Sequence, residues 1–172
     1  MLMTTFNRRI YHSWGQFWQD MRFPLRNRPK IRAAMRGGLV SFAFRERLML
    51  SVTAVNGCRY CSYFHAKEAV KAGLPEAELR NLLHGVADET TPAEELPALL
   101  YAQHWAESNA QPDPEARQKL IATYGAERSE AIETVLRMIR MGNLLGNQWD
   151  YMLTRVTFGR YGLTQAERTG QP

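Results

Sequence analysis

Apolar positions recur at helical spacing along most of the chain. From residue 44 to 55, and again from 128 towards 151, apolar residues return every three or four positions, which is the period of a helix with one buried face. Alternating runs of β-branched residues bounded by turns, the pattern of strands, do not occur. The pattern therefore predicts an all-α protein with a helical-bundle core.

Turn residues divide this pattern into successive helices. Asn56-Gly57 is a typical helix end, Gly73 ends the next helix, and Pro75 fits the first turn of a third. Thr91-Pro92 and Pro112-Asp113-Pro114 indicate two later starts. We expect helices over residues 44–55, 58–73, 75 to about 88, 92–109, from 112, and from 128 to 151 or beyond.

The last of these helices contains Gly142 and Gly146, four residues apart. Glycine inside a helix costs about 1 kcal/mol relative to alanine, so such a pair usually has a packing reason. We expect both glycines to admit a neighbouring helix, in the core or at a subunit boundary, rather than a ligand. Asn143 and Asn147 share a face one turn apart. They could direct polar groups into the thiol site, but most such pairs are solvated or locally hydrogen-bonded, so we expect them to lie outside the site.

The length of 172 residues, 45% of them apolar, suffices for one core of ordinary size. We expect one helical domain over 41–160, with a basic N-terminal arm of short helices (1–40) as part of it and a loose polar tail (161–172). No early apolar run suits a signal peptide, and no stretch approaches the roughly 20 apolar residues of a spanning helix. These features favour a cytoplasmic protein.

The formal charge of +5 is concentrated in the first quarter of the chain, which carries a net +8 over residues 1–47 against −3 over the remainder. We interpret these basic residues as a solvated connector and short helix rather than an anion-binding groove. No nucleic-acid motif accompanies them, so we expect no nucleic-acid partner. Trp14 and Trp18 stand at helical spacing in the arm, and we expect them to pack on the core or on a second subunit rather than on a membrane.

Cys58 and Cys61 are the only cysteines, and His65 follows them within one predicted helix. At positions i and i+3 of a helix two cysteines are close enough for a disulfide. His65 stands four residues after Cys61, on the same face. The sequence therefore predicts a thiol pair that has its own base.

Both cysteines fall in the first turn of the predicted helix, directly after Asn56-Gly57. Unpaired backbone N–H groups and the helix dipole favour a thiolate there and can lower a thiol pKa to roughly 3.5–7.5. In a reducing compartment a closely spaced cysteine pair is more often catalytic or metal-binding than a structural crosslink. We therefore predict a reactive dithiol.

Glu46, twelve residues before Cys58, completes the pattern Glu-x11-Cys-x2-Cys-x3-His. This pattern resembles the signature of the AhpD-like alkylhydroperoxidases of the carboxymuconolactone decarboxylase superfamily, and the segment 66–75 resembles that family's helix ending in Ala-Gly. The resemblance implies an all-helical homo-oligomer (dimer, trimer or hexamer) that reduces hydroperoxides. It further implies a redox-active disulfide between Cys58 and Cys61, no other cofactor or metal, and a dithiol reductant such as a lipoyl-bearing protein.

The resemblance also implies a role for each residue. Cys61 would be the attacking thiol and Cys58 the resolving one, while His65 takes the proton and Glu46 orients the imidazole. Tyr60 stands where the founding peroxidase has a second histidine, and we expect it to be an accessory hydrogen-bond donor. The chemistry also stands without the family, because a thiolate attacks a peroxide and a neighbouring thiol then traps the sulfenic acid as a disulfide.

Several alternatives remain open at this point. A structural zinc site would need both cysteines together with His65 and Glu46, a less common ligand set than those rich in sulfur. The four side chains could also be inert packing. On the same scaffold a lactone decarboxylase is possible, although the cysteine pair is not the working feature of that branch. The last alternative is a non-enzymatic redox sensor that presents the N-terminal arm to a partner.

Overall fold

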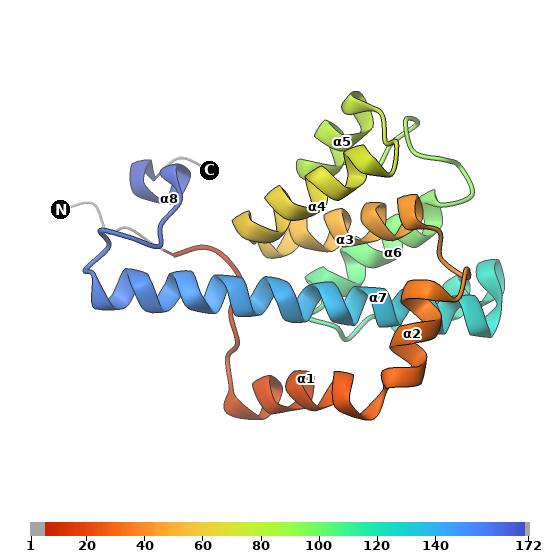
Figure 1. The fold of residues 1–172 in the computed structure, drawn as a ribbon, viewed down its shortest axis with the longest axis horizontal. Helices are drawn as coiled ribbons and strands as arrows, with labels where there is room; N and C mark the ends of the chain where they lie inside the picture. Colours follow the sequence, from red (N-terminus) through yellow and green to blue (C-terminus); the bar gives the residue numbers. More distant parts are fainter. Residues whose placement is uncertain (1–5, 171–172) are drawn as a thin grey trace.

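The structure, a computed structural model, describes residues 6–170 of the chain, so residues 1–5 of the expected arm and 171–172 of the expected tail lie outside it. Within the described residues it contains eight helices and no strand, which confirms the all-α prediction (Figure 1). The helices are α1 (Trp14–Arg26), α2 (Arg28–Arg36), α3 (Phe42–Asn56), α4 (Arg59–Lys71), α5 (Glu76–Leu83), α6 (Leu96–Glu107), α7 (Pro114–Val156) and α8 (Gln165–Thr169).

Helix α3 is the centre of the fold. It packs against α4, α5, α6 and α7, and most of its residues from Phe44 onward are buried, polar ones included. Its start is capped by Ser41, whose hydroxyl accepts a hydrogen bond from the Phe44 N–H. Its end is Gly57, where φ is 75° and a glycine avoids the steric cost of the left-handed conformation. Residues of α3 are therefore held rigidly on all sides.

One core cluster contains buried apolar side chains from each of the helices α2 to α7. None of the helices within residues 6–170 has an apolar stretch long enough to cross a lipid bilayer. The largest fully buried side chains of this core include Phe44, Leu48, Leu50, Leu82, Leu99, Trp105, Ile132 and Leu136.

Helix α7 runs the length of the molecule, with α3 to α6 on one side of it and α1 on the other (Figure 1). The sequence predicts two helices here, one from 112 and one from 128. The structure joins them at Gly125, whose φ of 77° and ψ of 163° are not helical and suit glycine alone. A sharp bend at one residue therefore replaces the expected connecting segment.

The aromatic residues of α1 do not enter the core. Trp14 and Trp18 are 77% and 53% exposed, and α1 has no buried residue. Both rings pack edge-on against Phe17 instead. Packing on the protein's own core was one of two expectations for these residues and is wrong; the other, contact with a second subunit, stays a prediction.

The polar tail is not loose over its described residues. Leu163 is buried, and Thr164 caps α8 in a reciprocal hydrogen-bonded pair with Glu167. Glu167 is also buried and accepts hydrogen bonds from the Arg8 guanidinium. The expectation of a loose tail is wrong because a charge pair with the distant Arg8 holds it, and local composition gives no sign of such a pair.

Candidate functional site: a dithiol at the start of a helix

The turn between α3 and α4 positions the two cysteines. Cys58 is the N-cap residue of α4 and Cys61 lies in its first turn, as the sequence predicts. The backbone N–H of Cys61 donates a hydrogen bond of 3.3 Å to the Cys58 sulfur. A side chain at Gly57 would be strained by its positive φ and would meet Arg8 at 2.8 Å. This turn is therefore specified by Gly57 and by the cap.

The two sulfur-bearing residues differ in exposure. Both are free thiols in this structure; Cys58 is fully buried, whereas Cys61 is half-buried. A substrate approaching from solvent therefore has better access to Cys61.

Glu46 and His65, from successive helices, form the second part of the site. The Glu46 carboxylate lies 2.7 Å from His65 Nδ1, and Glu46 is only 2% exposed. Arg45 Nε lies 3.6 Å from the other carboxylate oxygen and adds positive charge beside it. A carboxylate that accepts from Nδ1–H fixes the imidazole tautomer and leaves Nε2 as the proton acceptor. Such an imidazole is oriented to exchange protons.

Negative charge on the pair is favoured at Cys58. The S–H of Cys61, the backbone N–H groups of Cys61 and Tyr60, and the Asn143 amide stabilise the Cys58 thiolate and together lower the pKa of Cys58 to about 7, against the opposing effect of burial. The pKa of Cys61 is raised for three reasons: its S–H donates to the Cys58 sulfur, Cys61 is partly buried, and the negative charge of the Cys58 thiolate lies beside it. One thiolate is thus available near neutral pH, shared through a hydrogen-bonded pair.

Tyr60, the expected accessory residue, is directed towards α7. Its hydroxyl donates a 2.7 Å hydrogen bond to the fully buried Asp150, and Arg59 donates to the same carboxylate oxygen. Burial and the Asp150 carboxylate raise the pKa of Tyr60. In this arrangement Tyr60 ties the segment between the cysteines to α7.

Two asparagines that the sequence leaves outside the site are fully buried beneath it. The side chain of Asn143 donates to Thr53 and accepts from Asn56, at 3.0 and 3.1 Å. Asn147 donates to the backbone carbonyls of Asn56 and Arg9, at 2.8 Å each. These contacts hold the end of α3 against α7, so the expectation that both asparagines are solvated or locally bonded is wrong.

Gly146 makes direct contact with the dithiol segment, and Gly142 does not. A methyl group added at Gly146 would lie 2.9 Å from the Cys58 sulfur and 3.3 Å from the Tyr60 ring, whereas nothing lies within 4 Å of one added at Gly142. The expected close packing therefore holds for Gly146 alone, and its partner is a cysteine side chain. The repeat Gly142-Asn143 and Gly146-Asn147 was the available signal in the sequence.

Other buried charges near α3 are paired with one another. Arg47 donates to Glu78 at 2.6 Å and to Glu95 at 3.1 Å, on the side of α5 and α6. Across the part of the chain that the structure describes, no group of three or more His, Cys, Asp and Glu side chains is placed to hold a metal ion. The zinc alternative therefore lacks a ligand set in this geometry.

Comparison with known protein families gives a match over the segment that contains the candidate site. Residues 30–104 match the sequence model of the carboxymuconolactone decarboxylase family, which includes AhpD-like proteins. Over those residues the chain is similar to that family. That matched segment contains both cysteines, Glu46 and His65, while α7 lies beyond it. Searches of curated proteins and of solved structures found no match.

Proposed function

We propose that this protein is a cysteine-based thiol peroxidase that reduces hydroperoxides and is recycled by a dithiol. The observation that carries the proposal is a pair of thiols at the start of α4, where the Cys61 N–H donates to the Cys58 sulfur, on the same helix as a histidine held by a buried carboxylate. A peroxidase needs a thiolate, a second thiol to trap the product and a route for protons. The match of residues 30–104 to the family model supports an enzymatic role.

In the first step the Cys61 sulfur attacks one peroxide oxygen. Cys61 first gives its proton to the Cys58 thiolate or to His65, and a sulfur–oxygen bond then forms as the oxygen–oxygen bond breaks. The departing alkoxide takes a proton from the site and leaves as an alcohol. Cys61 becomes a sulfenic acid, and its half-buried position is the more accessible of the two.

In the second step Cys58 resolves the sulfenic acid. Its thiolate attacks the Cys61 sulfur, a disulfide forms, and the hydroxyl group leaves as water with a proton. The lowered pKa of Cys58 suits this role, because a thiolate is present near neutral pH. One hydroperoxide and two thiols thus give one alcohol, one water and one disulfide.

Reduction of the disulfide follows from the difference between the pKa values of the two thiols. An external dithiol attacks the Cys61 sulfur of the disulfide, and Cys58 is the better leaving group because its thiol pKa is the lower. A second exchange releases the oxidised donor and restores both thiols. A lipoyl-bearing protein is our proposed donor.

The test is consumption of reduced dihydrolipoamide with an organic hydroperoxide. We expect turnover by the wild type, none by Cys61→Ser, and a trapped sulfenate or mixed disulfide in Cys58→Ser. His65→Ala should slow turnover by about 10²-fold or more, the lower range for loss of a positioned base. His84→Ala is the matched control, because His84 is exposed on α5's C-terminal cap, and it should retain full activity.

Lactone decarboxylation is a second candidate because the matched family bears that name. If the protein is a decarboxylase, a variant lacking both thiols should still release carbon dioxide from a muconolactone. Absence of peroxide turnover in reduced wild-type protein, together with that result, would replace the peroxidase proposal.

A further inference from the structure

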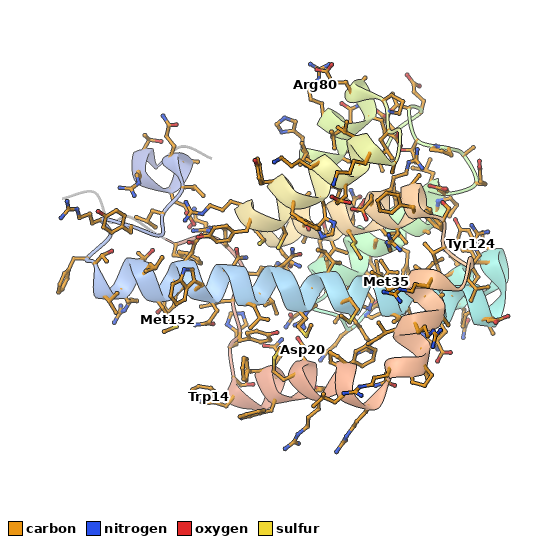
Figure 2. All side chains as sticks on the ribbon, viewed as in Figure 1. Trp14, Asp20, Met35, Arg80, Tyr124 and Met152 are labelled. Atoms are coloured by element: carbon orange, nitrogen blue, oxygen red, sulfur yellow. The ribbon has the colours of Figure 1, made fainter. Side chains whose placement is uncertain are left out.

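A groove lies where the end of α1 and helix α2 meet α3 and α7. Its volume is about 870 Å³, it is open to solvent, and Met35 of α2 lies on it (Figure 2). Its walls come from residues far apart in sequence, from Leu25 of α1 to Met138 of α7. The groove is therefore a product of tertiary packing.

Four arginines line this groove. Arg28, Arg32 and Arg36 are spaced four residues apart and so occupy one face of α2, and Arg45 joins them from α3. No acidic side chain lines the groove. Like charges gathered on one wall repel one another, so an anion bound between them is stabilised.

These guanidinium groups retain donors for a ligand. Within residues 6–170, no carboxylate lies within ion-pair distance of the three α2 arginines. Arg45 donates to the Met35 carbonyl, and its Nε lies 3.6 Å from the Glu46 carboxylate but has no hydrogen-bond partner among the described atoms. Arginine forks bind phosphate and carboxylate oxygens in pairs, which makes such an anion the fitting ligand.

The rest of the lining is aliphatic. Leu25, Ile31, Met35 and Met138 provide apolar surface beside the arginines, and no aromatic ring contributes. Bases of single-stranded nucleic acid are usually held by stacking on aromatic rings, whereas flexible methionine and leucine side chains accommodate an alkyl chain. The chemistry of this groove is thus that of an anionic head next to an apolar tail.

We propose that the groove binds a small amphiphilic anion, a phosphate or carboxylate attached to an aliphatic chain. This site goes beyond the proposed peroxidase function and does not depend on it. It also revises the interpretation of these arginines as a solvated connector. The sequence places three of them on one helix face, but only the fold adds Arg45 and the apolar wall.

The experiment is calorimetric titration of the full chain with decyl phosphate and with decanoate, each kept below the concentration at which it forms micelles. We expect saturable binding of at least one, and its identity distinguishes a phosphate from a carboxylate head group. Inorganic phosphate and decanol, which each carry half of the ligand, should bind at least about tenfold more weakly. Arg28→Gln/Arg32→Gln should weaken amphiphile binding at least about tenfold, as charge-assisted hydrogen bonds are lost.

Arg22→Gln/Arg155→Gln is the matched control, because it removes the same charge from two exposed arginines outside the groove. It should leave binding within twofold of the wild type. Leu25→Asp is a second, independent variant that alters the apolar wall and keeps every arginine, and it should weaken amphiphile binding tenfold. Equal weakening by both arginine pairs, no binding of either amphiphile, or tighter binding of a short oligonucleotide at the same arginines would each overturn the proposal.

Discussion

Gly146 packs so closely against Cys58 that there is no room for a side chain at position 146. The nearest heavy atom to a β-carbon built there is the Cys58 sulfur at 2.9 Å, with the Tyr60 ring at 3.3 Å. Cys58 is fully buried and cannot move outward without losing its packing. The position of Cys58 is therefore set from α7 as well as from its own helix.

We predict that Gly146→Ala and Gly142→Ala change the free energy of unfolding in opposite directions. Gly146→Ala should destabilise the protein by about 1–3 kcal/mol, because the added methyl group overpacks the Cys58 contact. Gly142→Ala should stabilise it by up to about 1 kcal/mol, because alanine favours the helix and meets no neighbour. Urea unfolding of both variants measures the difference, and a similar change in both would contradict the role of Gly146.

At the scale of one element, the first turn of α4 concentrates hydrogen-bond donors on the Cys58 sulfur. The backbone N–H groups of Cys61 and Tyr60 point to it because Cys58 is the cap residue, and the largest single contribution is the Cys61 S–H. The neighbouring thiol and the helix start together favour the thiolate at Cys58.

We predict that Cys61→Ala raises the pKa of Cys58 from about 7 towards the ordinary thiol value of about 8.5. The variant loses the S–H donor that stabilises the thiolate, while burial, which disfavours charge, remains. A lowered pKa means that the thiolate is present above it and lost as the pH falls through it, so the variant should have less thiolate at pH 7. Ultraviolet absorbance of the thiolate across a pH series measures the midpoint.

The control for this titration is Tyr63→Ala, which alters an exposed ring on the same helix two residues beyond Cys61. It should leave the midpoint near 7. A Cys61→Ala midpoint equal to that of the wild type would mean that the backbone donors alone hold the charge.

At the scale of the whole molecule, both end segments meet beside the dithiol turn. Arg8 donates hydrogen bonds to Asp150, to the Gly162 carbonyl and to Glu167, and its stem packs on Gly57. Figure 1 places α8 at the same end of α7 as the N-terminal segment. The described parts of the arm and tail therefore support the turn that carries Cys58.

We predict that the ion pair between Arg8 and Glu167 makes the free energy of unfolding decrease at acid pH. Burial disfavours the charge on Glu167, but Arg8 and the backbone N–H groups of Thr164 and Asn7 outweigh it, so the pKa of Glu167 is lowered. A lowered carboxyl pKa gives stability that is fully present above the unfolded pKa of about 4.3 and is lost as the pH falls through the folded value. Glu167→Gln should not show this acid-dependent loss of stability. The test is the free energy of unfolding of both proteins, measured from about pH 3 to about pH 7.

Glu115→Gln is the matched control for the acid titration. Glu115 is exposed at the start of the α7 run, and its replacement should leave the acid-dependent loss of the wild type in place. The same pH profile in Glu167→Gln and in the wild type would show that Glu167 is not the titrating group.

Much of the fold follows from local pattern. The start of α4 after Asn56-Gly57 and the end of α4 before Gly73 lie close to where turn residues place them. The break between the helix from 112 and the helix from 128 was predicted, but its reduction to a single bend at Gly125 was not, because a glycine accepts many backbone conformations and its residue type does not say which one it adopts. The packed tail was missed because its partner, Arg8, is 159 residues away.

The candidate site, like the fold, could be predicted from the sequence only in part. Spacing within one helix selected Cys58, Cys61 and His65, and the resemblance to the family's signature added Glu46; the structure places the Glu46 carboxylate at 2.7 Å from the imidazole. The catalytic roles of these residues stay predictions. Asn143 escaped selection because nothing in its local sequence distinguishes a buried amide from a solvated one.

The sequence by itself determined the all-α class, the dithiol at a helix start and its register with a histidine, because helical geometry relates residues three and four apart wherever the helix lies. Only the tertiary structure decided which thiol is buried, that Gly146 and Asn143 lie beneath the dithiol, and that four arginines share a groove with aliphatic side chains. Those properties depend on contacts between helices about 90 residues apart in the chain, as between Asn143 and Thr53. Periodicity along one helix carries no information about which distant helix covers it.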